Sequence, residues 1–291
     1  MKPKIKKIKE VFDAACEPPR ALVDFAKLKL VWPKIKDKLP DGDGHPVLFL
    51  PGFLSSDNGF TTTLRACVEE KGYKTYGWDN GRNMGFDEKT AKALKKRLKE
   101  VYKKNGKKKV TLIGHSLGGV YARELAREFP EMVRGVITLA SPFGMLDDAD
   151  KGARSPARKA YDMLNPGASP LDDAGFEKRC LTPPPVPTTS IYTKGDGIVN
   201  WKAALNPVAP ETENIEVDGS HIGMVFNPLA LSAVLDRLSQ PEGAWQPFDA
   251  KKYSHAVFPD TDPQGNVPAN PDFKHDKKNS IFKGSRKKPK P

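Results

Sequence analysis

The chain has 291 residues, of which 38% are hydrophobic, and this is enough for a substantial core in one large domain or two small ones. The net charge of +12 lies at the ends, because residues 1–40 and 251–291 each carry an excess of six positive charges while the middle is formally neutral. Three cysteines, Cys16, Cys67 and Cys180, argue against a disulfide framework. A secretion signal and an apolar stretch of about 18 residues are both missing from the sequence, so we expect a cytoplasmic protein without a membrane span.

From about residue 46 the chain alternates between short apolar runs and helical patterns. This alternation is typical of a mostly parallel sheet with helices on both faces. The predicted strands cover residues 47–50, 73–78, 110–113, 133–139, 188–193 and 214–217. The predicted helices cover about residues 58–71, 87–105, 117–129 and 228–239.

Composition divides the chain into three parts. Residues 1–44 form a basic extension, 45–248 a central α/β domain and 249–291 a basic, Pro-rich tail. The extension has two apolar sets between lysines, which predict two short amphipathic helices that either contact an anionic membrane or pack on the body. Within the central domain, the alternation lapses at about 142–187, and we predict a cap over the site there, with a loop of no function as the alternative. The basic tail lacks a recognition motif, so we expect no specific nucleic-acid partner.

The motif Gly-His-Ser-Leu-Gly at residues 114–118 follows a predicted strand and begins a predicted helix. Glycines on both sides of Ser116 allow the tight turn that lifts a serine hydroxyl above the sheet edge. We therefore predict that Ser116 is a nucleophile. Cys16 and Cys67 are alternative nucleophiles, but neither has a His or Asn constellation in the nearby sequence.

A serine nucleophile needs a base and an acid to orient that base, in the chain order serine, acid, histidine. His221 follows the last predicted strand and is the predicted base, whereas the other histidines precede the first strand, lie inside the turn or belong to the tail: His45, His115, His255 and His275. Asp196 lies between two glycines after a strand and is the predicted acid. The competing acids are Asp147, Asp148, Asp150 and Asp218.

Acyl transfer also needs N–H donors for the oxyanion. We predict the backbone amides of Leu117, just after the nucleophile, and of Phe53, in the loop after the first strand. The alternative for the second loop is a tight turn that matters only for shape. The loop at residues 77–85 either lines the substrate pocket or is structural, and Arg82 within it could meet a substrate carboxylate or an aspartate of the cap.

Five sequence blocks carry a family resemblance, in the order Leu50–Phe53, Gly114–Leu125, Thr138–Phe143, Asp196–Val199 and Gly219–His221. Over residues 46 to about 248 the chain resembles the α/β-hydrolase superfamily, in particular bacterial esterases and lipases. The resemblance implies about eight mostly parallel strands, a serine acyl-enzyme mechanism, no cofactor and no metal. Pro51 departs from the pattern, because many lipases have a histidine there that props the oxyanion loop.

The predicted function is therefore hydrolysis of a carboxylic ester, with a small-molecule or lipid ester as substrate. Two alternatives stay open: an acyltransferase that uses the same three residues, and a noncatalytic hydrolase-like protein that tethers a partner through its basic ends.

Overall fold

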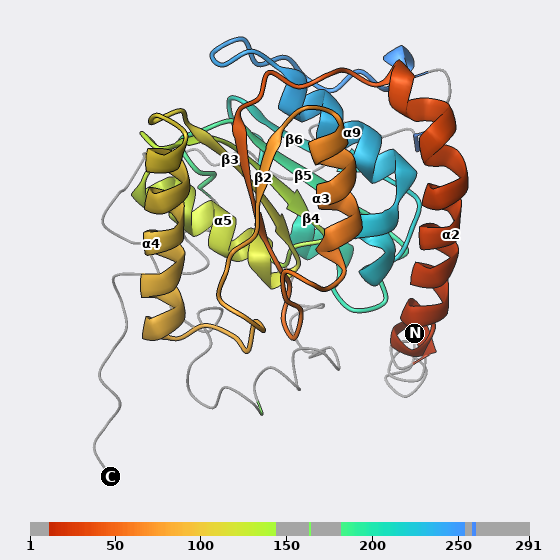
Figure 1. Ribbon diagram of the computed structural model, residues 1–291. Coiled ribbons are helices and arrows are strands. Elements are labelled where there is room, and N and C mark those ends of the chain that lie inside the picture. The colour runs from red at the N-terminus through yellow and green to blue at the C-terminus, as the bar shows by residue number, and fades with distance from the viewer. Residues whose placement is uncertain (1–11, 144–162, 164–181, 254–257, 260–291) are drawn as a thin grey trace.

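Figure 1 shows the computed structural model, which describes residues 12–143, 163, 182–253, 258 and 259. Most of the predicted cap, at 144–162 and 164–181, lies outside the described residues. So do residues 1–11, with the first apolar set of the extension, and most of the C-terminal tail.

The centre of the molecule is a sheet of six parallel strands in the order β2-β1-β3-β4-β5-β6. They are β1 (Pro46–Leu50), β2 (Lys74–Tyr76), β3 (Val110–His115), β4 (Val133–Leu139), β5 (Thr188–Tyr192) and β6 (Thr212–Glu216). All six predicted strands are confirmed to within two residues. The described residues contain these six strands alone, so the expected number of about eight is not confirmed.

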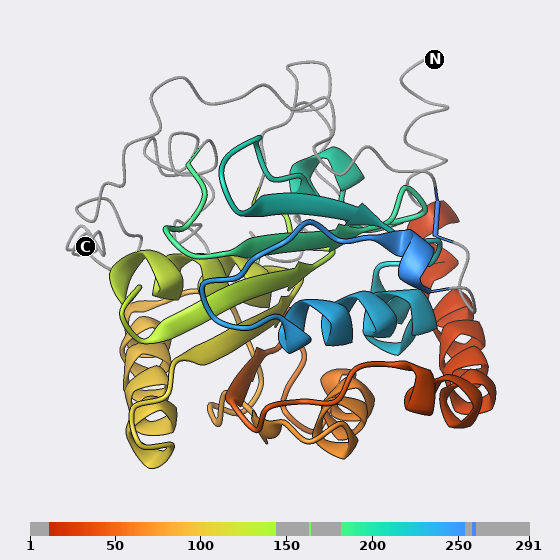
Figure 2. The same ribbon diagram turned by 90° about the horizontal axis from the view of Figure 1, so that it is seen from above.

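Helices cover both faces of the sheet, as predicted (Figures 1 and 2). The covering helices are α3 (Thr61–Glu70), α4 (Glu88–Lys104), α5 (Leu117–Glu128) and α9 (Pro228–Ser239). Alternate residues of β1 contribute to the two cores: Val47 and Phe49 pack with α3 and α9, whereas Leu48 and Leu50 pack with α4 and α5. Period-two alternation in the strands thus builds two hydrophobic layers.

The lysine-rich helix α4 shows why local sequence and fold agree. Ala91, Leu94, Leu98 and Val101 form its buried stripe, at spacings that return to the same face of a helix. The Asp87 side chain caps the first turn by accepting a hydrogen bond from the Thr90 amide at 2.6 Å.

The sheet order sets the place for a ligand. Because β1 lies between β2 and β3, the chain leaves β1 to one side and returns on the other, which makes a topological switch point at the carboxyl ends of β1 and β3. Ligands of open α/β sheets bind in the crevice outside such a point.

The extension contributes the helix α2 (Glu17–Ile35), which lies beside α9 and the 3-10 helix η4 (Ile222–Phe226) (Figures 1 and 2). Leu28 on α2 is buried against the body, whereas Leu22 and Leu30 are exposed. The buried face also contains two carboxylates, Glu17 and Asp24. Contact of the basic ends with a membrane stays a prediction, and none of the described helices is long and apolar enough to span one.

Candidate active site

Ser116 occupies the sharp turn between β3 and α5, at the carboxyl end of β3. Its backbone has φ 50° and ψ −123°, a conformation that a residue with a side chain rarely adopts. The Ser116 amide donates to the Leu139 carbonyl at 2.8 Å, which ties this strained residue to the neighbouring strand β4. The strand, strained turn and helix expected from the motif are therefore present.

Glycine is required at two positions of this turn because backbones approach closely. A Cβ at Gly114 would collide with the backbone of Gly118, and a Cβ at Gly118 would collide with the Leu50 carbonyl. The start of α5 therefore touches the end of β1, from which the predicted oxyanion loop begins.

That loop, at residues 51–55, is held by a buried asparagine from the loop after β2. Asn83 Nδ2 donates to the Pro51 carbonyl at 2.8 Å, and the Asn83 carbonyl accepts from the Leu54 amide at 2.7 Å. The Asn83 amide donates in turn to the Ser55 carbonyl at 2.8 Å. Although Pro51 stands where many lipases have a supporting histidine, the hydrogen bonds of Asn83 hold this loop in place.

Asp196 and His221 meet at the carboxyl edge of the sheet, from the loops that follow β5 and β6. His221 Nδ1 lies 2.7 Å from Asp196 Oδ2, and both side chains are buried. Asp196 Oδ1 accepts from the amides of Ile198 and Val199 at 2.8 and 2.7 Å. The carboxylate is thus fixed by its own loop while its other oxygen orients the imidazole.

The environment of His221 favours a proton on the ring. Burial alone would lower its pKa, but the charge of Asp196, the hydrogen bond from Nδ1 and the charge of Glu17 outweigh burial and raise the pKa above its ordinary value. With Nδ1–H donating to Asp196, the other ring nitrogen, Nε2, is the one with a lone pair for a substrate or nucleophile.

His115, which the sequence argument set aside, lies against the predicted base. The ring centroids of His115 and His221 are 5.2 Å apart, and His115 Nε2 donates to the His221 carbonyl at 2.9 Å. Burial and the nearby charge of His221 lower the pKa of His115 to about 4, so His115 stays neutral at pH 7. It holds the backbone of His221, and the motif gives no signal for this contact.

Ser116 is adjacent to His115 in sequence, so it lies in the same region as His221, but the described contacts of Ser116 do not include a hydrogen bond to the His221 ring. Unaligned nucleophile–base bonds are common in sites without substrate. The Leu117 amide is the first of α5 and has no acceptor within the helix. Phe53 lies in the loop that Asn83 braces.

The other candidates fit a catalytic role less well. His45 is buried between Asp43 and Thr111, where Nδ1 lies 2.5 Å from an Asp43 oxygen and Nε2 2.9 Å from the Thr111 hydroxyl, at the amino end of the sheet. Asp218 is exposed. Burial raises the pKa of the Cys67 thiol to about 11, which disfavours the reactive thiolate. The remaining candidates lie outside the described residues: Asp147, Asp148, Asp150, His255 and His275.

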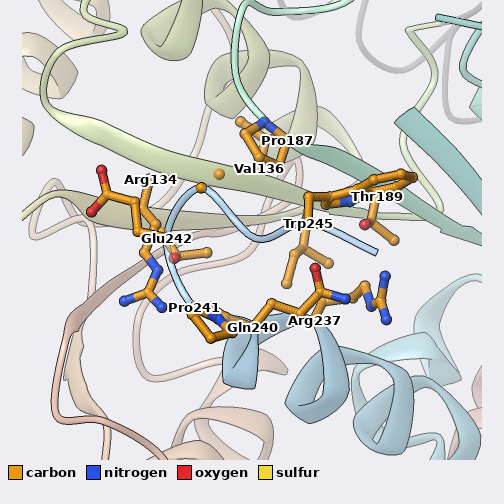
Figure 3. Close-up of a pocket in the computed structure, with 13 residues that line it drawn as sticks. Arg134, Val136, Pro187, Thr189, Arg237, Gln240, Pro241, Glu242 and Trp245 are labelled. Carbon is orange, nitrogen blue, oxygen red and sulfur yellow. Dashed lines mark hydrogen bonds between the residues drawn. The ribbon is translucent and has the colours of Figure 1, made fainter. Parts of the chain in front are cut away.

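A small cavity of about 50 Å³ lies near the amino ends of β3, β4 and β5 (Figure 3). Arg134, Arg237 and Trp245 are among its lining residues. Both arginines are already paired, Arg134 with Asp43 and Arg237 with Glu213. Because Ser116 follows the carboxyl end of β3, this cavity lies at the opposite edge of the sheet from Ser116. Over the described residues, no three His, Cys, Asp or Glu side chains are grouped so that they could hold a metal ion.

Comparisons with known proteins agree with the fold. The family model of the alpha/beta hydrolase fold matches residues 45–172. A lipase B from Aspergillus fumigatus superposes with a TM-score of 0.53 at 18% identity, over 75% of this chain and 58% of that chain. Naproxen esterase from Bacillus subtilis (TM-score 0.44, 17% identity) covers 68% of this chain and 85% of its own. A lipase from Bacillus licheniformis (TM-score 0.44, 17% identity) covers 69% of this chain and 94% of its own.

The chain thus spans less than two thirds of the Aspergillus lipase, and curated protein sequences give no significant match. The parallel sheet, the helices on both of its faces and the family match carry the assignment. The chain therefore has the α/β-hydrolase fold.

Proposed function

We propose that the protein hydrolyses carboxylic esters through a covalent acyl-enzyme on Ser116. The observation that carries the proposal is the buried 2.7 Å contact between His221 and Asp196, beside a serine in the strained turn at the end of β3. These are the three groups that a serine hydrolase needs, in the chain order of this fold.

The reaction has two halves. His221 Nε2 takes the Ser116 proton while Oγ attacks the ester carbonyl, and the imidazolium then gives that proton to the leaving alcohol as the C–O bond breaks. In the second half His221 takes a proton from a water, which attacks the acyl carbonyl, and the imidazolium returns that proton to Ser116 Oγ as the acyl C–O bond breaks and the carboxylic acid leaves. The amides of Phe53 and Leu117 are the proposed donors to the oxyanion in both halves.

The surface beside the oxyanion loop favours an apolar acyl group. Leu54 and Met84 are 44% and 49% exposed. The Leu54 amide donates to the carbonyl of Asn83, the residue before Met84, so the two segments lie side by side. Two large, exposed apolar side chains beside this loop suit an apolar acyl chain better than a charged one.

The test is turnover of p-nitrophenyl esters by the wild type and Ser116→Ala, together with labelling by a fluorophosphonate. We expect the substitution to abolish labelling and to lower kcat by at least about 1000-fold. Ser239→Ala is the matched control, because Ser239 ends α9 far from the carboxyl edge of the sheet. If Ser116→Ala hydrolyses the esters as fast as the wild type, the proposal is wrong. Product analysis with an added alcohol separates hydrolysis from acyl transfer.

A further inference from the structure

Glu17, near the start of the N-terminal helix α2, is fully buried. Each of its carboxylate oxygens accepts a hydrogen bond from a backbone amide of a different loop. Oε1 accepts from Gly197 at 2.7 Å, and Oε2 accepts from Ile222 at 2.9 Å. Burial of a carboxylate is tolerated where such donors replace water.

The two amides belong to the residues that directly follow Asp196 and His221. They are 180 and 205 residues away from Glu17 along the chain. A single carboxylate thus bridges the loop of the predicted acid and the loop of the predicted base.

Two further residues of α2, Arg20 and Asp24, contact the same loops. Arg20 donates to the Gly195 carbonyl at 2.6 Å and also to the Gly219 carbonyl. Asp24 accepts from the Ser220 hydroxyl at 3.3 Å. The residues before and after both Asp196 and His221 are therefore held by one helix.

The glycines of these loops fit the helix closely. A Cβ at Gly195 would lie 2.6 Å from the Arg20 guanidinium, and a Cβ at Gly223 would collide with the Asp24 carboxylate. A Cβ at Gly197 would lie 3.0 Å from Glu17 Oε1. Only loops without side chains at these points can approach α2 so closely.

We propose that Glu17 is a positioning residue, which holds Asp196 and His221 in register by fixing the backbone of both loops, and that the N-terminal helix is thereby part of the active site. The proposal rests on the function proposed above for its kinetic readout. Glu17 contacts no reacting atom and acts through the two loops.

The charge of Glu17 adds a second effect. Among the described residues, the charged and titratable groups near His221 include Asp196 from the β5 loop, Glu17 from α2 and His115 from β3, with Arg20 3.9 Å from Glu17 and the Asp24 carboxylate close enough to interact with Glu17. Asp196 and Glu17 both raise the pKa of His221. Because the neutral imidazole is the active base, kcat/KM rises with pH through this pKa, and loss of the Glu17 charge must move that acid limb to lower pH.

The decisive variant is Glu17→Gln, which keeps the size of the side chain. The side-chain amide of glutamine has a single acceptor oxygen. Its NH₂ group would therefore face the backbone N–H of Gly197 or Ile222, and one of the two hydrogen bonds would be lost. We expect kcat to fall about 10- to 100-fold with little change in KM, and the acid limb to move to lower pH. A folded variant with wild-type kcat and a wild-type acid limb would overturn the proposal.

Two more variants separate charge, geometry and folding. Asp37→Asn removes the same charge from the exposed 3-10 helix η1 (Lys36–Lys38) and should leave kcat and the pH profile unchanged. Glu17→Asp keeps the charge but is too short for both amides, so kcat should fall while the acid limb moves less. If Glu17→Gln fails to fold by circular dichroism, Glu17→Asp decides: wild-type kcat in that variant overturns the proposal.

An NMR titration of the His221 ring separates this proposal from the proposed function, because it needs no turnover. In Glu17→Gln we expect a lower His221 pKa and a changed Nδ1 proton signal. If the wild type hydrolyses no ester but these signals change, positioning stands and the proposed function fails. If the wild type is an esterase and the signals do not change, the positioning role fails.

Discussion

The two halves of the candidate site are built in different ways. Ser116 and the predicted oxyanion loop lie at the ends of adjacent central strands, where close contacts between backbones fix them. Asp196 and His221 lie on loops after the last two strands, and a helix from the other end of the chain holds these loops.

The difference shows where each half is vulnerable. The nucleophile half depends on the absence of side chains at glycines, so added atoms should damage it. The acid–base half depends on polar side chains of α2, so removed atoms should damage it. The glycine and loop substitutions below test the nucleophile half, and Glu17→Gln tests the acid–base half.

The largest effect is expected from Gly118→Ala. The new Cβ would collide with the Leu50 carbonyl, so α5 must move and carry Ser116 and the Leu117 amide out of line. We expect kcat/KM to fall by about 1000-fold or more and the free energy of unfolding to fall by about 1–3 kcal/mol. Ester kinetics and urea unfolding measure these effects.

Gly243→Ala is the control for this substitution. Gly243 has φ 79° and open space around it, so alanine there adds backbone strain without a collision and should leave kcat/KM unchanged. Equal kinetics for Gly118→Ala and wild type would mean that close backbone packing does not fix the nucleophile.

The next largest effect is expected from Asn83→Ala, which removes the brace of the oxyanion loop. Its side chain makes the 2.8 Å hydrogen bond to Pro51 and is fully buried. We expect kcat to fall about 10- to 100-fold with a smaller change in KM, because the oxyanion donors act on the transition state. Asn80→Ala, in the same loop, should keep wild-type kcat; if both variants lose the same activity, the loop as a whole matters rather than this brace.

The sequence predicted the strand, turn and helix around Ser116 because the signal for them is local. The strand before Ser116, the glycines around it and the helix after it lie within about 20 residues, and the structure has all three. The strands and helices were predicted for the same reason. Bracing contacts from distant segments, as with Asn83 and Glu17, leave no such pattern.

The sequence of α2 nevertheless contains one sign of this role. Glu17 and Asp24 recur at helical spacing with Ala21, Leu28 and Ile35, so two carboxylates lie on an otherwise apolar stripe. A carboxylate on a buried stripe needs donors, but the sequence does not say which loops supply them. The sequence therefore left open whether the extension contacts a membrane or packs on the body, and α2 packs on the body.

Acid should destabilise the folded protein through the buried His115. The His115 pKa is about 4 in the folded protein because burial and the charge of His221 disfavour its protonation, whereas an unfolded histidine titrates near 6.5. Between these values the unfolded state holds more protons, so the free energy of unfolding falls as pH falls, by up to about 3 kcal/mol. Urea unfolding at pH 7 and pH 5 should show a smaller difference for His115→Gln than for the wild type; equal differences would contradict this account.

The smallest effect concerns the exposed apolar side chains of Leu54 and Met84 beside the predicted oxyanion loop. Leu54 has φ 63°, a conformation that asparagine adopts readily, so Leu54→Asn removes apolar surface without adding strain. Because the loop backbone keeps its braces, kcat/KM for short-chain esters should stay near wild type, while that for long-chain esters falls about three- to tenfold. Leu30→Asn, at a more exposed leucine of α2, is the control. A parallel loss for short and long chains would instead show that Leu54 shapes the loop itself rather than the surface that an acyl chain contacts.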